Sequence, residues 1–159
     1  MGTIVRKRDM AASSLMQPAR RNFFGFTLSV ALCAVVGPNN ALAADLNGRA
    51  SAPRAYSLSN NNKLRLVDIR RPSEWRTTGV GKGARRISMH QSGFVNRIDK
   101  LLGGDRSKPV ALICAHGNRS RRMKARLNKL GFTNVVNVSE GMLGSKAGPG
   151  WLKRGLPTR

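Results

Sequence analysis

Residues 110–120 read VALICAHGNRS, an apolar run that ends at a cysteine and passes through a glycine into a basic, polar segment. Val110–Cys114 is apolar almost without interruption, as in a strand covered on both faces of a sheet. Ser120–Leu130 then shows the spacing of apolar residues that is typical of a helix, and Gly131 follows it. The stretch therefore predicts a buried strand, a short loop and a helix.

The same alternation of strand and helix patterns extends to both sides of this unit. Connections that pass through helices are typical of a parallel sheet. We therefore expect an α/β fold, with a central, mostly parallel sheet flanked by helices on both faces. The predicted strands are Leu64–Ile69, a weaker Ile87–Met89, and Val135–Val138; the predicted helices are Pro72–Thr78, closed by Gly79, and a segment capped by Ser92 that ends at Gly103-Gly104.

The first 43 residues have the pattern of an export signal. A basic region precedes the apolar segment Phe23–Val36, which is followed by the small-residue site Ala41-Leu42-Ala43. Because its 14 residues fall short of the ~20 that cross a bilayer, we expect cleavage after Ala43, a periplasmic protein and no stable membrane span. Arg20-Arg21 resembles a twin-arginine signal, although Ala19 stands where Ser or Thr is usual, so both export routes stay open. We expect a linker at 44–53 and one domain at 54–159.

The chain is strongly basic, with 29 Lys and Arg against 7 Asp and Glu and a net charge of +22. Removal of residues 1–43 leaves the rest strongly basic as well. Such a charge attracts small oxyanions, anionic lipid surfaces, acidic proteins and nucleic acid, unless it reflects only a solvated, Arg-rich surface. Nucleic acid is not expected as a partner, because aromatic residues make up only 5% of the chain.

The sequence has two cysteines, and removal of a signal peptide that contains Cys33 would leave Cys114 as the one thiol of residues 44–159. An internal disulfide in those residues is therefore excluded. In open α/β sheets, sites lie beyond the carboxyl ends of strands, where Cys114 and Asp68 are both predicted to be. A strand–loop–helix turn presents backbone N–H groups and the positive end of a helix, which favours a thiolate. The alternative is a small cysteine buried in the core.

These residues resemble the rhodanese family over about 56–157. The motifs that carry the resemblance are LVDIR at 66–70 with PSEW at 72–75, CAHGNRS at 114–120, GF at 131–132, VSEG at 138–141 and the closing WLKRGLP at 151–157. The resemblance implies a rhodanese-like fold and a thiosulfate sulfurtransferase that needs no cofactor or metal. Cys114 would take a sulfane sulfur as a persulfide and pass it to cyanide or a thiol.

The resemblance also implies roles for the surrounding residues. Arg119 would hold the oxyanion end of a small anionic donor as a planar fork, and Arg70 is expected to pair with Glu74. An acidic redox or sulfur-carrier protein is a further candidate partner. The implied site consists of catalytic Cys114, the loop residues Ala115, His116, Gly117, Asn118, Arg119 and Ser120, and the supporting residues Asp68 and Arg70.

Several features depart from the family pattern or favour other functions. The segment 79–84 reads GVGKGA where many relatives carry GHIPGA, and residues 57–63 are too few for the usual first helix. Related phosphatase loops place five residues between Cys and Arg, whereas four separate Cys114 from Arg119, which argues against phosphatase chemistry. A binding or sulfur-relay module without small-molecule turnover remains the alternative function, and a direct role for His116 stays open.

Overall fold

The computed structural model describes residues 47–159, so the predicted export signal lies outside the described residues. Their core is a five-stranded sheet of order β1-β5-β4-β2-β3 in which every strand pairing is parallel. The expected α/β class is thereby confirmed. The strands are β1 Arg49–Ala50, β2 Arg65–Asp68, β3 Arg85–Arg86, β4 Val110–Ile113 and β5 Val135–Val138.

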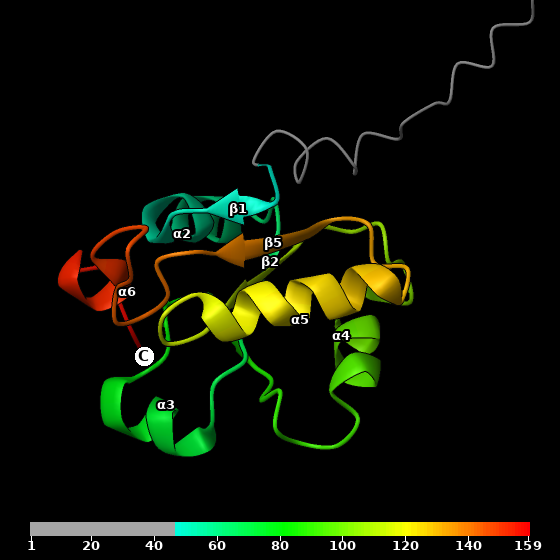
Figure 1. Ribbon diagram of the computed structural model, residues 1–159, viewed down its shortest axis with the longest axis horizontal. Coiled ribbons are helices and arrows are strands. Elements are labelled where there is room, and N and C mark those ends of the chain that lie inside the picture. Colours follow the sequence, from blue (N-terminus) through cyan, green and yellow to red (C-terminus); the bar gives the residue numbers. More distant parts are fainter. Residues whose placement is uncertain (1–46) are drawn as a thin grey trace, which may run out of the picture. The chain divides into compact units, whose positions relative to one another are not determined.

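Helices cover both faces of this sheet, with α2 on one side of the strands and α4 and α5 on the other (Figure 1). Because side chains alternate along a strand, each central strand feeds two cores. In β4, Ile113 packs with the α2 and α6 layer, whereas Leu112 packs with α4 and α5. The helices are α2 Ala52–Asn60, α3 Pro72–Thr78, α4 Phe94–Leu102, α5 Asn118–Lys129 and α6 Gly150–Lys153.

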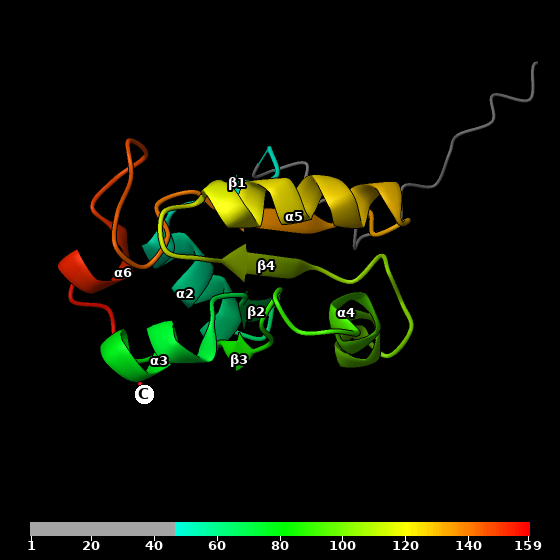
Figure 2. The ribbon, with the colours of Figure 1, turned by 60° about the horizontal axis from the view of Figure 1, so that its bottom comes forward.

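The register of the central strands brings two of the predicted site positions to one edge. Asp68 of β2 is aligned with Ile113 of β4, so Cys114 comes one residue beyond Asp68 at the carboxyl end of the sheet. Figure 2 shows β4 pointing toward the end where α3 and α6 lie, and the chain then turning back into α5. The edge expected from the sequence is therefore the edge that carries the cysteine loop.

The segment expected as a linker is largely part of the fold. Arg49–Ala50 forms β1, paired with Asn137 and Val138 of β5. The first helix, expected to be missing, is α2, which begins at Ala52. Ser51 caps it by accepting a hydrogen bond from the Arg54 N–H at 3.3 Å, and Pro53 occupies its first turn. The stretch has the composition of a linker because its small, polar residues are those of a helix start. The strand has only two residues, too few to show an alternation of apolar and polar side chains.

Three further boundaries differ from the sequence-based prediction. The regular ladder of β3 is Arg85–Arg86, while Ile87–Met89 continues it with isolated bonds to the end of β2. The residue before helix α4 is Gly93, whose backbone has a left-handed conformation. Gly93 therefore takes the cap position, and Ser92 does not. Helix α5 begins at Asn118, two residues before the predicted start. Within residues 47–159, no helix is both long and apolar enough to cross a membrane.

Candidate active site

Cys114 lies directly after β4, and its side chain is almost completely buried, with 1% of its surface exposed. Its Sγ lies 3.4 Å from the backbone N–H of Ser120 and 3.3 Å from the Ser120 Oγ. Ser120 is in the first turn of α5, so the N–H that points at the sulfur belongs to the positive end of a helix. This arrangement stabilises negative charge on Cys114.

Gly117 allows the loop to turn tightly enough to bring α5 over the sulfur. It adopts φ +78°, and a Cβ at this position would overlap the carbonyl oxygen of Ser139 at the end of β5. Only glycine meets both requirements without strain.

A second segment, residues 141–143, braces the cysteine loop from outside. The Met142 N–H donates to the Cys114 carbonyl at 2.8 Å, and the Leu143 N–H donates to the Ala115 carbonyl at 2.9 Å. Gly141 makes this approach possible, because a Cβ there would collide with the same two carbonyl groups. The loop is therefore held by backbone contacts on both sides.

Arg119 closes the loop and forms a two-pronged ion pair with Glu74 of α3, at 2.8 and 2.5 Å. The expected pairing of Arg70 with Glu74 is wrong, because Glu74 faces the cysteine loop. Its hydrogen bonds with Arg119, against the opposing effect of burial, lower the pKa of Glu74 to about 2. The same bonds raise the pKa of Arg119, with a smaller contribution from Cys114.

Asp68 and Arg70 form a buried pair beneath the loop edge. The guanidinium of Arg70 donates to both Asp68 carboxylate oxygens at 2.7 to 3.0 Å, and both side chains are essentially inaccessible to solvent. Arg70 also donates to Thr78 Oγ1 and to the Gly79 carbonyl, each at 2.7 Å. The pair thereby fixes the end of α3, the helix that carries Glu74, which agrees with a supporting role.

The remaining loop side chains point elsewhere. The exposed His116 places Nδ1 2.7 Å from the Gly144 carbonyl, so it links the cysteine loop to the 144–147 turn. His116 and Asn118 line a hollow of about 510 Å³ together with that turn and Arg121 of α5. Ala115 is buried and contributes its carbonyl to the bracing contact. Of the seven loop residues, Ser120 is therefore the one whose N–H and hydroxyl contact the Cys114 sulfur, while Arg119 contacts Glu74.

Sequence reasoning missed Glu74 as a member of the site, as well as the bracing segment. Glu74 is the one acidic residue of α3, and that was the available signal, but several arginines competed as its partner. Residues 141–143 act through backbone groups, which leave no side-chain signal. Within residues 47–159, no three His, Cys, Asp or Glu side chains gather in a cluster that could hold a metal ion.

The Glu74–Arg119 pair should make stability depend on acid pH. Because the folded-state pKa of Glu74 is near 2 and its ordinary value is 4.5, the pair stabilises the fold above about pH 4.5. This stability is lost as the pH falls from 4.5 toward 2. Urea unfolding of wild type and Glu74→Gln between pH 7 and 3 should show a smaller loss for the variant. Parallel losses in both proteins would contradict the assignment.

The family model of the rhodanese-like domain matches residues 51–147. The thiosulfate sulfurtransferase GlpE of Pseudomonas paraeruginosa is 29% identical over 90 residues, which cover 57% of this chain and 76% of that protein. The crystal structure of Rv0390 from Mycobacterium tuberculosis matches with a TM-score of 0.53 and 30% identity, covering 70% of this chain and 96% of that one. A polysulfide-sulfur transferase from Wolinella succinogenes matches with a TM-score of 0.52 and 25% identity, covering 75% and 87%.

The fold and the loop together define a parallel α/β domain that presents a cysteine at a strand–loop–helix turn. Since the family model spans more than half of the sequence, the chain belongs to the rhodanese-like domain family. Its relatives include proteins named as sulfurtransferases, which agrees with the resemblance found in the sequence.

Proposed function

We propose that this protein is a sulfurtransferase that moves a sulfane sulfur from a small anionic donor, such as thiosulfate, to a thiol or cyanide acceptor. One observation carries the proposal: the Cys114 sulfur lies at the start of α5 within reach of the Ser120 N–H and hydroxyl. A persulfide is an anion at neutral pH, and helix N-termini bind anions. The named activities of the relatives support the same class of reaction.

The reaction consists of two displacements at sulfur. The Cys114 thiolate attacks the outer sulfur of thiosulfate, the S–S bond of the donor breaks, and sulfite leaves with the electron pair. Cyanide then attacks the outer sulfur of the persulfide, forms thiocyanate and returns the electron pair to Cys114. No net oxidation occurs, so neither a redox partner nor a cofactor enters the scheme.

Intact-mass spectrometry tests the proposal directly. Incubation with thiosulfate should add one sulfur, about 32 Da by atomic mass, to a protein that can form the persulfide. Cyanide should remove it. A parallel incubation with polysulfide separates the two donor chemistries named among the relatives. A protein whose thiol alkylates readily but gains no sulfur from either donor would exclude the proposed reaction.

Arg119 is the residue proposed to hold the anionic end of the donor. Arg119→Ala should raise the thiosulfate KM and lower kcat/KM by roughly 1.5–3 kcal/mol in transition-state free energy, the range of one charge-assisted hydrogen bond. Arg119→Lys should recover only part, because an ammonium cannot present two parallel donors. Arg122→Ala, exposed on the same helix, is the matched control. Equal kinetics for Arg119→Ala and Arg122→Ala would remove the assigned role.

The alternative function is a binding or sulfur-relay module without small-molecule turnover. Two observations favour it: the Cys114 side chain is 99% buried, and the guanidinium of Arg119 is already occupied by Glu74. A relay module would take up sulfur from a persulfide-bearing protein but would show no steady-state turnover of thiosulfate. The kinetic assay therefore separates the two functions.

We further propose that the protein is exported to the periplasm and cleaved after Ala43. The basic segment, the 14-residue apolar core and the small-residue site support this. Amino-terminal sequencing of the protein from a periplasmic fraction should begin at Ala44. Recovery of the intact amino terminus from a cytoplasmic fraction alone would contradict export.

A further inference from the structure

Two adjoining hollows lie along the free edge of the sheet, beside β3, away from the residues assigned above. The larger, of about 520 Å³, lies between β3 and α4, and five of its seven lining residues are cationic. The smaller, of about 420 Å³, lies between β3 and the end of α2. Arg85 and Arg159 line both hollows and so separate them. We name this surface the β3 groove; the larger hollow has Arg85, Arg86, Arg97, Lys100 and Arg159, and the smaller adds Arg65 and Lys82.

Within the described residues, no acidic side chain neutralises the positive charge of the β3 groove. No Asp or Glu side chain lines either hollow, and none of the seven cations takes part in a salt bridge. The acidic side chains Asp68, Glu74, Asp99 and Glu140 are all paired with other arginines. An anion that enters the groove would therefore meet cations without a competing Asp or Glu side chain.

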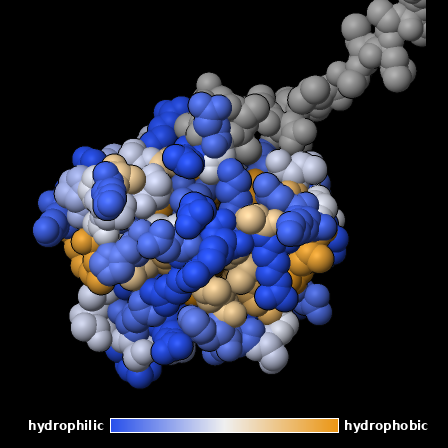
Figure 3. Space-filling view, viewed as in Figure 1, coloured by the Kyte–Doolittle hydropathy of each residue, from blue (hydrophilic) through white to orange (hydrophobic). Residues whose placement is uncertain are grey.

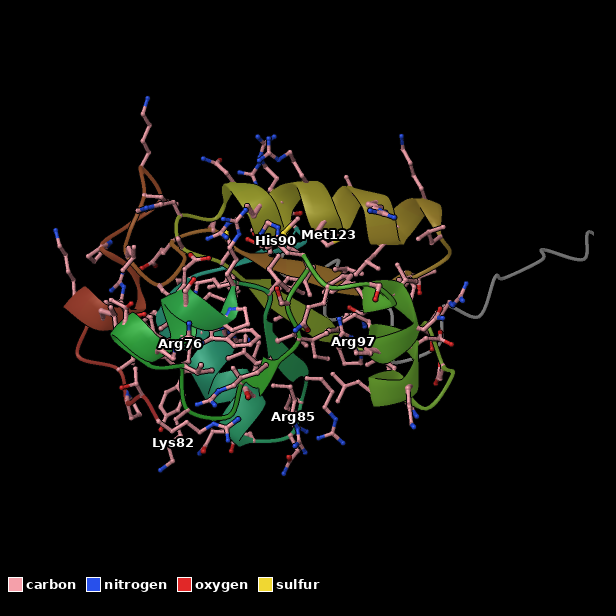
Figure 4. The ribbon with its side chains drawn as sticks, turned by 90° about the horizontal axis from the view of Figure 1, so that it is seen from below. Arg76, Lys82, Arg85, His90, Arg97 and Met123 are labelled. Carbon is pink, nitrogen blue, oxygen red and sulfur yellow. The ribbon has the colours of Figure 1, made fainter. Side chains whose placement is uncertain are left out.

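The fold holds several of these cations in place. Arg159 is fixed by two backbone hydrogen bonds with Val80, at 2.9 and 3.1 Å, and its Nη2 donates to the Ala84 carbonyl at 2.7 Å. Arg97 of α4 donates from Nη1 to Gln91, while its buried Nε and Nη2 have no hydrogen-bond partner. Figure 4 shows Lys82, Arg85 and Arg97 on one face, although they come from three different segments.

The shape and lining of the groove favour one kind of occupant. Ile87 and Leu101 add an apolar wall to the cationic rim of the larger hollow. Two hollows in sequence along an edge strand suit an extended chain. Alternating acidic and apolar side chains would satisfy both parts of the lining. An acidic peptide segment therefore fits better than a single small anion.

We infer that the β3 groove docks an acidic, partly apolar segment of a partner protein. Arg86 is aligned with Asp68, and Asp68 with Ile113, so the groove lies two strand spacings, about 10 Å, from the strand that carries Cys114. The smaller hollow is also lined by Arg65, the first residue of β2, which lies at the opposite end of that strand from Asp68, so a partner held in the groove would leave the cysteine loop uncovered. The docking itself does not depend on the proposed function, which only identifies the partner as one that exchanges sulfur with Cys114.

Charge reversals in matched pairs test the inference on the full chain. The probe is a labelled synthetic peptide in which Asp and Glu alternate with Leu, and its control carries Asn and Gln in their place. Arg85→Glu with Lys100→Glu should weaken binding of the acidic peptide by at least about tenfold. Arg122→Glu with Lys129→Glu, at two exposed positions of α5, changes the net charge equally and should weaken binding by less than about twofold. The face of the molecule seen in Figure 3 is largely hydrophilic.

Each outcome decides the question. Equal weakening by both double variants would mean that only net charge matters and would overturn the inference. Equal binding of the acidic and uncharged peptides would also overturn it. So would the absence of peptide binding together with binding of anionic phosphatidylglycerol vesicles or single-stranded DNA that Arg85→Glu with Lys100→Glu weakens. Transfer from thiosulfate to cyanide should be unchanged in Arg85→Glu with Lys100→Glu. If the wild-type protein transfers no sulfur from thiosulfate to cyanide, the proposed function is rejected, but the docking result is unaffected.

Discussion

Cys114→Ser should lower the rate of sulfur transfer from thiosulfate to cyanide by at least about a thousandfold, because a hydroxyl replaces the thiol that we propose as the nucleophile. The substitution changes the buried volume little, so the fold should persist. Steady-state thiocyanate formation measures the rate, and intact mass after exposure to thiosulfate should show no added sulfur.

Cys33→Ser is the matched control, since the full chain carries a second cysteine within the predicted signal. It should retain the full rate and the full mass increase. Transfer that survives in Cys114→Ser but disappears in Cys33→Ser would contradict the assignment of the nucleophile. An unfolded Cys114→Ser protein, recognised from its thermal unfolding, would leave the mass increase in Cys33→Ser as the deciding measurement.

Gly117→Ala should be the most disruptive small substitution in the loop. Alanine in the left-handed conformation of Gly117 costs about 1–2 kcal/mol, and its Cβ would also overlap the Ser139 carbonyl, so we expect a loss of about 2–4 kcal/mol in unfolding free energy. Movement of the loop would carry the Ser120 N–H away from the sulfur. Persulfide formation should therefore be slower even at urea concentrations at which the variant is still folded.

Gly93→Ala separates conformational strain from steric overlap. Gly93 has φ +69°, close to the value at Gly117, but a Cβ there would meet no atom within 4 Å. The control should lose only about 1–2 kcal/mol and keep the full rate of persulfide formation. Urea unfolding and single-turnover mass measurements on both variants give the comparison. Equal losses would show that the close approach to Ser139 has no energetic role.

Local signals in the sequence were sufficient to predict the central unit of the fold and the position of Cys114 within it. The apolar run of β4, the glycine of the loop and the start of α5 lie within eleven residues, so no long-range contact is needed to predict them. The alternation of strands and helices likewise predicted the parallel sheet. β1 escaped prediction because its two residues carry no period and depend on pairing with β5, far away in the sequence.

The sequence by itself determined that Cys114 ends a buried strand and that an anion-favouring turn follows it, because these are properties of neighbouring residues. Only the tertiary structure decided which charges face that turn. Glu74 and Arg119 are 45 residues apart, and nothing in their spacing distinguishes this pair from the expected pair of Glu74 with Arg70. Packing determines which pair forms. Asp68 forms a buried ion pair with Arg70 at the edge of the sheet, so Glu74 on α3 pairs instead with Arg119, the arginine that closes the cysteine loop.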